Sequence, residues 1–335
     1  MCETLVYELK KLGHEVIVIS LYSTETVITQ RLKKANVDIR FLNKRSGFDI
    51  CMYGKLRRIF KQEKPDVVHT HLYVTKYVFP IAAKLKIKAI HTLHSVAMFE
   101  AGRIDRLINK HYYKRCDVLP VVLSKKNETS FLDVYKMPAG FARVIMNGVN
   151  LENCIIKKDY QIHGNFKIVH VGRFTAEKNH KMLIEAFDLF HKNYADSELH
   201  LIGDGAEKSK ICKMVKERSL SKFVFFHGVL SSVFEYLYEM DIFTLTSLYE
   251  GMPMSVAEAM GTGLPIVATA VGGILDMLNE NNSQLVSVDK NEIARAFEIY
   301  YLNRDLREQY GKCALSESNR FSSVTMAKKY LELYR

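Results

Sequence analysis

The chain has 335 residues, of which 48% are hydrophobic, so it is long enough for two globular domains of ordinary size. Its apolar runs fall far short of the roughly 20 residues that a helix needs to cross a bilayer. The six cysteines are scattered without a Cys-x-x-Cys pair, which argues against a zinc site or a disulfide framework and fits a reducing cytosol.

The excess of positive charge lies entirely in the first half of the chain. Residues 1–150 contain 26 Lys and Arg against 13 Asp and Glu, a net charge of +13, whereas the remaining residues have a net charge of −2. A basic half can attract an anionic membrane surface or nucleic acid. Nucleic acid is the weaker reading, because there is no known binding motif, no Trp and no stripe of basic and aromatic residues on one helix. A solvated basic surface without a partner remains the alternative.

Short apolar runs alternate with amphipathic segments of helical length through the first half. We expect helices over residues 5–12, 52–62, 74–85 and 104–114, a further helix capped by Ser124, and strands over residues 14–20, 37–42, 65–71, 88–94 and 117–123. This alternation predicts a doubly wound parallel sheet with helices on both faces. Ligands bind such sheets at the carboxyl ends of the strands.

Three histidines stand at predicted strand ends, namely His69, His71 and His94. A neutral imidazole there could hydrogen-bond a hydroxyl or share developing charge. For any one of them, a packed or solvated histidine is the commoner case. A metal site is disfavoured, because no nearby carboxylate completes a ligand set.

The end of the first domain is indicated by RVIMNGVN, where Asn147 and Gly148 allow positive φ and a sharp turn. The strand FKIVHVGR and the loop after it then open a second domain, with Arg173 and Lys178 near the carboxyl end of the strand. Two cations placed there can neutralise phosphate oxygens. We expect a first domain over residues 1–150, a linker over 151–165, a second domain over 166–320 and a terminal helix over 321–335 that packs back toward the first domain.

The stretch SLYEGMPMSVAEAMGTGLPIVATAVGG, residues 247–273, carries the strongest signal. A strand over 242–246, a Gly-Met-Pro turn and a helix starting near Met254 place free N–H groups where an anion is stabilised. Glu250 and Glu258 flank this turn with seven residues between them. Carboxylates beside a phosphate favour sugar hydroxyls as partners, so the pattern indicates a nucleotide-sugar site. The alternative is an ordinary α/β unit with solvated glutamates and glycine caps.

These blocks resemble the donor site of retaining GT-B glycosyltransferases of family 4, whose S-x-x-E-G-x-P, E-A-M, G-x-P-V-V-A-T and G-G segments are matched here in order. The resemblance extends from Leu5 to the end of the chain. It implies an α/β GT-B fold of two Rossmann-like doubly wound parallel-sheet domains facing a cleft. It also implies transfer of a sugar, with retention, from a nucleotide diphosphate sugar to a hydroxyl acceptor, in bacterial cell-surface polysaccharide or glycolipid synthesis.

The resemblance assigns roles to individual residues. Arg173 and Lys178, in a block like G-R-L-x-x-x-K-G, should bind the donor diphosphate, Glu258 the ribose and Glu250 the transferred sugar. His94 matches the histidine that the family places beside that sugar. The expected catalytic set is His94, Glu250, Arg173 and Lys178. The remaining implied donor contacts are Phe226, His227 and Gly228 for the base, and Gly251, Met252, Pro253, Met254 and Ser255 around the phosphates.

The resemblance also implies the partners. The donor is expected to be a UDP-sugar, and neither a metal nor a cofactor is expected, because Arg173, Lys178 and the helix N-terminus supply the positive field. The acceptor is expected to be a glycan or a lipid-linked sugar. The basic first domain would face an anionic membrane, which places the protein in the cytoplasm or peripherally at the inner face of the cell membrane.

The chain departs from the family pattern at its start, where relatives have a first strand and a Gly-Gly loop before the first helix. From this we expect a central strand to be missing and the present chain to be poorly soluble or inactive alone. Asp276 replaces a Glu of the family after the Gly-Gly pair.

A GT-B epimerase is a rival function that the spacing of the two glutamates disfavours. An inactive nucleotide-sugar-binding protein or gene fragment is a second rival, and product formation would separate it from an enzyme.

Overall fold

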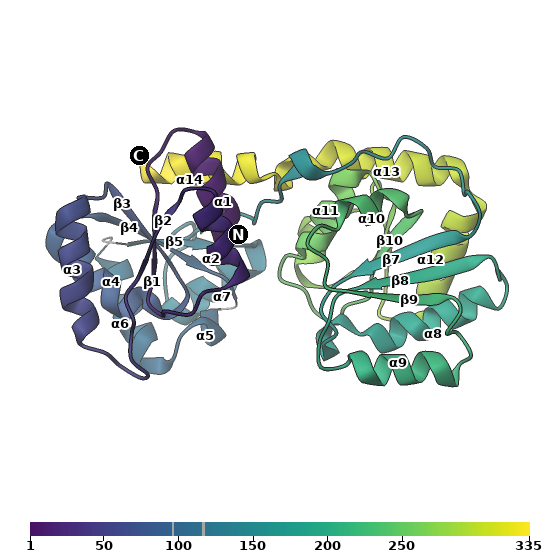
Figure 1. Cartoon of the computed structure of the whole chain (residues 1–335), viewed down its shortest axis with the longest axis horizontal. Helices are drawn as coiled ribbons and strands as arrows, with labels where there is room; N and C mark the ends of the chain where they lie inside the picture. Colours follow the sequence, from purple (N-terminus) through teal and green to yellow (C-terminus); the bar gives the residue numbers. More distant parts are fainter. Residues whose placement is uncertain (96, 116–117) are drawn as a thin grey trace. The chain divides into compact units, whose positions relative to one another are not determined.

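The computed structural model describes residues 1–95, 97–115 and 118–335. The chain divides into two compact units, which are described separately (Figure 1). Unit 1 consists of Met1–Gly148 and Ser323–Arg335, and unit 2 consists of Val149–Ser322. The terminal segment, yellow in Figure 1, therefore folds with the first part of the chain.

Unit 1 is built from parallel strands and helices. Its strands are β1 (Ile17–Ser20), β2 (Asp38–Phe41), β3 (Val67–His71), β4 (Lys88–Leu93), β5 (Val118–Val122) and β6 (Arg143–Val144). Its helices are α1 (Cys2–Lys11), α2 (Val27–Lys34), α3 (Cys51–Glu63), α4 (Thr75–Leu85), α5 (Ala97–Glu100), α6 (Arg103–Lys114), α7 (Lys125–Tyr135) and α14 (Ser323–Tyr334). Ser124 caps α7 as expected, its hydroxyl accepting from the Asn127 amide at 3.1 Å. Helix α2, absent from the sequence prediction, begins with a capping box between Thr26 and Thr29.

The strands of unit 1 form two separate sheets. Strand β1 pairs with β2, and β3, β4, β5 and β6 pair in that order, all in parallel. Helices α1 and α14 contact Val16 and Val67 in one apolar cluster, and α3 and α4 contact Ile19 and Val68 in another. The same two helical layers thus cover both sheets, and no backbone pairing joins β1 to β3 in the part of the chain described. Every residue of β1 is only half-buried, although its sequence is apolar.

Unit 2 contains a single six-stranded parallel sheet in the order β12-β11-β10-β7-β8-β9. Its strands are β7 (Phe166–Val171), β8 (Ser197–Ile202), β9 (Val224–Gly228), β10 (Ile242–Leu245), β11 (Ile266–Thr269) and β12 (Gln284–Val286). Its helices are α8 (His180–His191), α9 (Lys208–Glu217), α10 (Phe234–Glu239), α11 (Met254–Thr262), α12 (Lys290–Leu302) and α13 (Arg304–Ser318). In Figure 1, α8 and α9 lie along one side of the sheet, and α10 and α11 lie along the other. The strand order reverses between β7 and β10, which is where doubly wound sheets bind ligands.

The segment before β7 is fixed to unit 2. Tyr160 is buried, and its hydroxyl donates to the Gly263 carbonyl at 2.9 Å. The guanidinium of Arg307 in turn donates to the Tyr160 carbonyl at 2.8 Å. The structure therefore groups residues 149–165 with the second domain by contact, despite their polar composition and irregular backbone.

Candidate functional site

The loop after β7 is held at the carboxyl edge of the sheet by backbone bonds to the next strand. The Gly172 amide donates to the Ile202 carbonyl and the Phe174 amide donates to the Asp204 carbonyl, both at 3.0 Å. A Cβ on Gly203, which has a φ of +137°, would lie 2.0 Å from the Gly172 oxygen, so only glycine permits this approach. Arg173 is exposed at this edge, and no carboxylate pairs with it among the residues described.

Lys178 and Glu250, separated in sequence, form an ion pair. The Lys178 ammonium lies 2.5 Å from Glu250 Oε1, and the Ser247 hydroxyl donates to the same oxygen at 2.5 Å. Glu250 is only 7% exposed, so this pair is largely removed from water. The Thr269 hydroxyl donates to the Ser247 carbonyl at 2.7 Å and ties the group to β11. Ser247 is the Ser of the S-x-x-E block, and the position of its hydroxyl beside Glu250 was not predicted from the sequence.

The Gly-Gly pair after β11 allows the loop before α11 to pass close by. The Gly273 amide donates to the Glu250 carbonyl at 2.9 Å. A Cβ on Gly273 would lie 1.6 Å from the Gly251 oxygen, and Gly272 has a φ of +54°. Any side chain at either position would therefore push the Glu250 loop out of place.

Helix α11 presents its N-terminus at the same edge. It starts at Met254 as predicted, after Pro253 in extended conformation, and no side chain caps it. Its first turn carries no acidic residue, so its amides and dipole favour an anion. The predicted sequence of strand, turn, helix and strand is confirmed by β10, α11 and β11.

Glu258 lies on α11 with a different environment from that of Glu250. It is half-buried, and no hydrogen bond or ion pair of its carboxylate is found among the residues described. Burial, with nothing to offset it, raises the pKa of Glu258 to about 7. The ionised form of this carboxyl group is therefore destabilised in the folded protein, as expected of a group whose hydrogen-bond partner comes from a ligand.

The raised pKa of Glu258 predicts that Glu258→Gln stabilises unit 2 at pH 8. A folded-state pKa above the unfolded value means that ionisation opposes folding once the pH exceeds the unfolded pKa of about 4.3. The gain should reach roughly 3 kcal/mol at pH 8, since each pKa unit corresponds to about 1.4 kcal/mol, and should vanish near pH 4. Urea unfolding at the two pH values measures it, with the exposed Glu280→Gln as the matched control. An equal gain at both values would contradict this origin.

The expected base contacts lie on β9. Phe226 is partly buried against the core of unit 2, with its ring centre 6.0 Å from that of Phe174 in the loop after β7. His227 stacks on His200 with ring centres 5.2 Å apart, and burial lowers its pKa. Gly228 has a φ of +70°, and its carbonyl accepts from the Gly203 amide at 2.7 Å. All three residues keep intermediate exposure, so the backbone and both rings are accessible on this strand.

His94 lies in unit 1, directly after β4. Its Nε2 is 3.0 Å from Nδ1 of His71, so one of the two rings donates and the other accepts. Burial lowers the pKa of both, which keeps both neutral at pH 7. His69 Nδ1 lies 2.7 Å from the Tyr334 hydroxyl, and His69 Nε2 lies 2.8 Å from the Thr92 hydroxyl. Burial lowers the pKa of His69 to about 3, so both ring nitrogens of this neutral side chain are used in contacts within unit 1. In the described ranges no group of three or more His, Cys, Asp or Glu residues is placed to hold a metal.

Comparison with known proteins assigns both halves of the chain. The profile of "Glycosyltransferase Family 4" matches residues 1–153, and that of "Glycosyl transferases group 1" matches residues 154–316. An uncharacterized glycosyltransferase of Methanocaldococcus jannaschii, MJ1059, is 24% identical over 64% of this chain and 58% of its own length. The UDP-Gal:alpha-D-GlcNAc-diphosphoundecaprenol alpha-1,3-galactosyltransferase of Escherichia coli is 30% identical over 65% of this chain and 61% of its own. The chain thus spans about three fifths of both relatives.

A likeness to solved structures confirms the fold. Alr3699/HepE of Anabaena, crystallised with UDP and glucose, superposes with a TM-score of 0.82 at 17% identity, covering 99% of this chain and 95% of that protein. A glycosyltransferase of Rickettsia africae superposes with a TM-score of 0.85 at 21% identity, covering 99% and 92% of the two chains. Two parallel-sheet units of this kind, together with the two matching profiles, show that the chain belongs to the group 1 glycosyltransferases, family 4, with the GT-B fold.

Proposed function

We propose that the chain is a retaining glycosyltransferase that moves a hexosyl or N-acetylhexosaminyl group from a UDP-sugar to a hydroxyl of a glycan or lipid-linked acceptor. The observation that carries this proposal is the buried Lys178–Glu250–Ser247 group beside the uncapped N-terminus of α11. The E. coli relative is named for a UDP-Gal donor and a diphosphoundecaprenol-linked acceptor, and the Anabaena protein binds UDP and glucose. Both support a UDP-sugar donor, and the acceptor of the E. coli relative supports a role in bacterial cell-surface polysaccharide or glycolipid synthesis.

The proposed roles follow from charge and hydrogen-bonding capacity. As the acceptor oxygen bonds to the anomeric carbon, the bond from that carbon to the β-phosphate oxygen breaks. The proton of the acceptor hydroxyl passes to water, and the departing diphosphate gains negative charge. Arg173, Lys178 and the amides at Met254 and Ser255 would neutralise that charge without a metal ion. Glu250 would accept from hydroxyls of the sugar and Glu258 from those of the ribose. By its place in the family pattern, His94 is proposed to bond a hydroxyl of the transferred sugar.

Formation of UDP from a panel of UDP-sugars tests the proposal. The purified protein is incubated with each donor, with and without a GlcNAc-diphospholipid acceptor, and in the presence of EDTA. We expect acceptor-dependent UDP release and a glycosylated lipid that keeps the anomeric configuration of the donor, both unaffected by EDTA. If UDP-sugars bind but none of them yields product, the protein is instead a nucleotide-sugar-binding protein without activity.

The separate roles of the two glutamates predict a specific pattern in titration calorimetry. Glu258→Ala should weaken the binding of UDP alone by roughly tenfold or more, since a hydrogen bond to a charged group contributes about 1.5–3 kcal/mol. Glu250→Ala should leave UDP affinity within about threefold and weaken only the UDP-sugar. Equal losses with both ligands would show that the two carboxylates do not divide ribose and sugar between them.

A further inference from the structure

Helix α6 of unit 1 exposes large apolar side chains where an outward-facing helix would ordinarily be polar. Ile104 is 74% exposed and Leu107 is 69% exposed, and their spacing places them on one side of the helix. Met98, on the neighbouring α5, is 51% exposed. Single exposed apolar residues need no explanation, but a group of three on adjacent helices marks an interaction surface.

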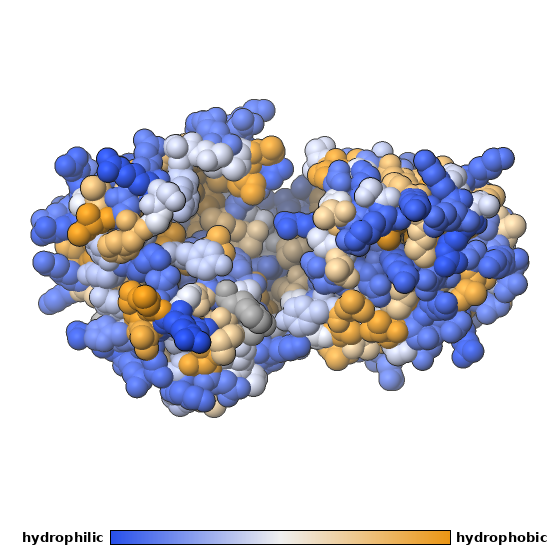
Figure 2. All heavy atoms as spheres, turned by 90° about the horizontal axis from the view of Figure 1, so that it is seen from below, coloured by the Kyte–Doolittle hydropathy of each residue, from blue (hydrophilic) through white to orange (hydrophobic). Residues whose placement is uncertain are grey.

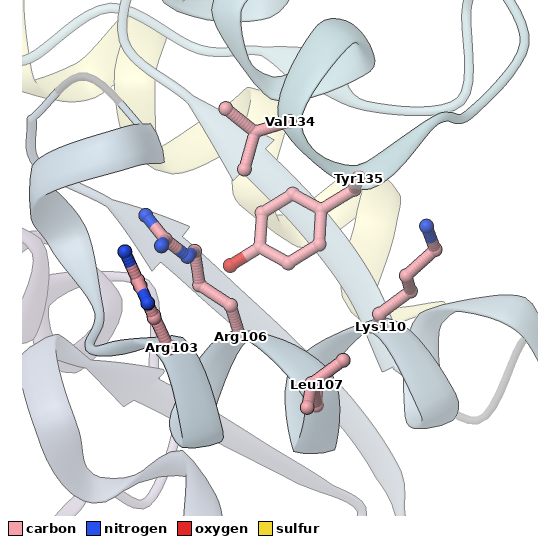
Figure 3. Close-up of a pocket in the computed structure, with 6 residues that line it drawn as sticks. All are labelled: Arg103, Arg106, Leu107, Lys110, Val134 and Tyr135. Atoms are coloured by element: carbon pink, nitrogen blue, oxygen red, sulfur yellow. The ribbon is translucent and has the colours of Figure 1, made fainter.

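Cations surround these apolar residues. A hollow of about 370 Å³ is lined by Arg103, Arg106, Leu107, Lys110, Val134 and Tyr135. Figure 3 shows these side chains, with the Tyr135 hydroxyl pointing toward Arg106. The Arg106 guanidinium is held by the Met98 carbonyl, to which it donates at 2.7 Å. We call Met98, Arg103, Ile104, Arg106, Leu107 and Lys110 the α6 face.

The positive charge of the α6 face is not neutralised locally. Across the described residues, no carboxylate forms an ion pair with Arg103, Arg106 or Lys110. The one acidic residue of α6, Asp105, pairs instead with Lys76 at 2.9 Å. Asp133 lines an adjoining hollow together with Arg106 and Lys136, so the charge of its carboxylate is exceeded by that of the two cations there. In Figure 2, hydrophobic residues on the surface of unit 1 likewise lie among strongly hydrophilic ones.

We propose that the α6 face binds the surface of an anionic phospholipid bilayer. Arg103, Arg106 and Lys110 would contact lipid phosphates, while Ile104, Leu107 and Met98 enter the boundary between headgroups and acyl chains. Nucleic acid fits less well, because its backbone offers nothing to the apolar side chains between the cations. In the described ranges no helix combines the length and apolar character needed to cross a membrane, so this would be attachment at the surface. Attachment through the α6 face does not depend on catalysis, but it would bring the protein to the surface that carries a lipid-linked acceptor of the proposed activity.

The absence of tryptophan from the sequence makes a direct test possible. Leu107→Trp places a single tryptophan fluorophore on the α6 face, and Val229→Trp places one at a 77% exposed position of unit 2. Vesicles of phosphatidylglycerol should shift the emission of Leu107→Trp to shorter wavelength, and bromine-labelled acyl chains should quench it. Val229→Trp should change in neither assay, and phosphatidylcholine vesicles should affect neither variant. If Leu107→Trp does not respond to the anionic vesicles at low salt, the proposal is wrong.

Charge reversal tests the cations with a matched control in the same unit. Arg103→Glu with Lys110→Glu should weaken binding to anionic vesicles at least about tenfold, since each basic residue near such a surface contributes about 1 kcal/mol. Arg57→Glu with Arg58→Glu makes the same change in net charge on exposed positions of α3 and should have a much smaller effect. Equal losses in the two variants would mean that net charge, rather than the α6 face, attracts the membrane, which overturns the proposal.

Soluble anions and enzymatic activity provide the last two comparisons. Millimolar inorganic phosphate or glycerol phosphate should leave the emission of Leu107→Trp unchanged. A response equal to that of vesicles would assign the hollow to a free anion and overturn the proposal. In an assay without vesicles, both charge-reversed variants should release UDP from the UDP-sugar at the rate of the unmodified protein. This result would distinguish loss of membrane binding from loss of the proposed transfer activity.

Discussion

Arg173→Ala is expected to lower the rate of sugar transfer at least about a hundredfold, because removal of one preorganised charge contact to a leaving group typically costs that much. The Arg173 side chain is exposed and no carboxylate pairs with it in the described structure, so its loss should not change the stability of unit 2. Turnover with a saturating UDP-sugar, measured beside thermal unfolding, tests both expectations.

Lys178→Ala should show the same loss of turnover together with a loss of stability. Glu250 would then keep a nearly buried carboxylate without its ion-pair partner, and breaking a buried pair in this way costs about 3–5 kcal/mol. Lys181→Ala, which removes an exposed lysine from α8 three residues later, is the matched control and should change neither quantity. Near-normal turnover in both Arg173→Ala and Lys178→Ala would refute the diphosphate assignment.

Unit 1 is expected to unfold as the pH falls from 6.5 toward 4.5. Burial lowers the pKa of His69 and of His91 to about 3, so each ring is neutral when folded and binds a proton when unfolded. A lowered pKa leaves stability intact above about pH 6.5 and removes it below, at up to roughly 1.4 kcal/mol per pH unit for each histidine. Over two pH units the two residues remove about 5 kcal/mol, a large part of the 5–15 kcal/mol typical of a domain.

A single substitution tests the origin of this acid sensitivity. His91 is 1% exposed and its Nδ1 lies 2.9 Å from the Thr70 hydroxyl. His91→Gln keeps a side chain that can form this hydrogen bond but does not titrate, so the midpoint of acid unfolding, followed by circular dichroism, should move to lower pH. His14→Gln changes an exposed histidine and should leave the midpoint in place. No difference between the two variants would show that other groups cause the acid unfolding.

The sequence was most informative where local chemistry determines the structure. The turn before α11, its start at Met254 and the cap of α7 by Ser124 were predicted because turn residues, glycines and capping hydroxyls act over a few neighbours. The alternation of apolar runs and helical segments in residues 1–150 predicted the parallel pairing of the strands of unit 1, but as one sheet rather than the two observed. The parallel sheet of unit 2 was implied by the family resemblance.

Contacts between distant segments could not be predicted in this way. The spacing of Glu250 and Glu258 is visible in the sequence, but their different environments are not. The Glu250 carboxylate is paired with Lys178, 72 residues earlier, whereas the Glu258 carboxylate has no partner among the described residues. Likewise, the bond between His71 and His94 depends on the parallel pairing of β3 with β4, which only the folded chain brings about.

The division of the strands of unit 1 into two sheets has a consequence for how this unit opens. The segment from β1 through α2 to β2 is joined to the rest of unit 1 by apolar packing and by the ion pairs Arg31–Glu3 and Arg40–Glu63, but by no sheet pairing, since β1 and β3 share no backbone pairing among the residues described. Such a segment can detach as one cooperative block without breaking a ladder hydrogen bond elsewhere. Unit 2, whose six strands form one continuous ladder, has no comparable line of separation. Local unfolding of the protein should therefore begin at β1 and β2, and it should leave the Lys178–Glu250 site folded.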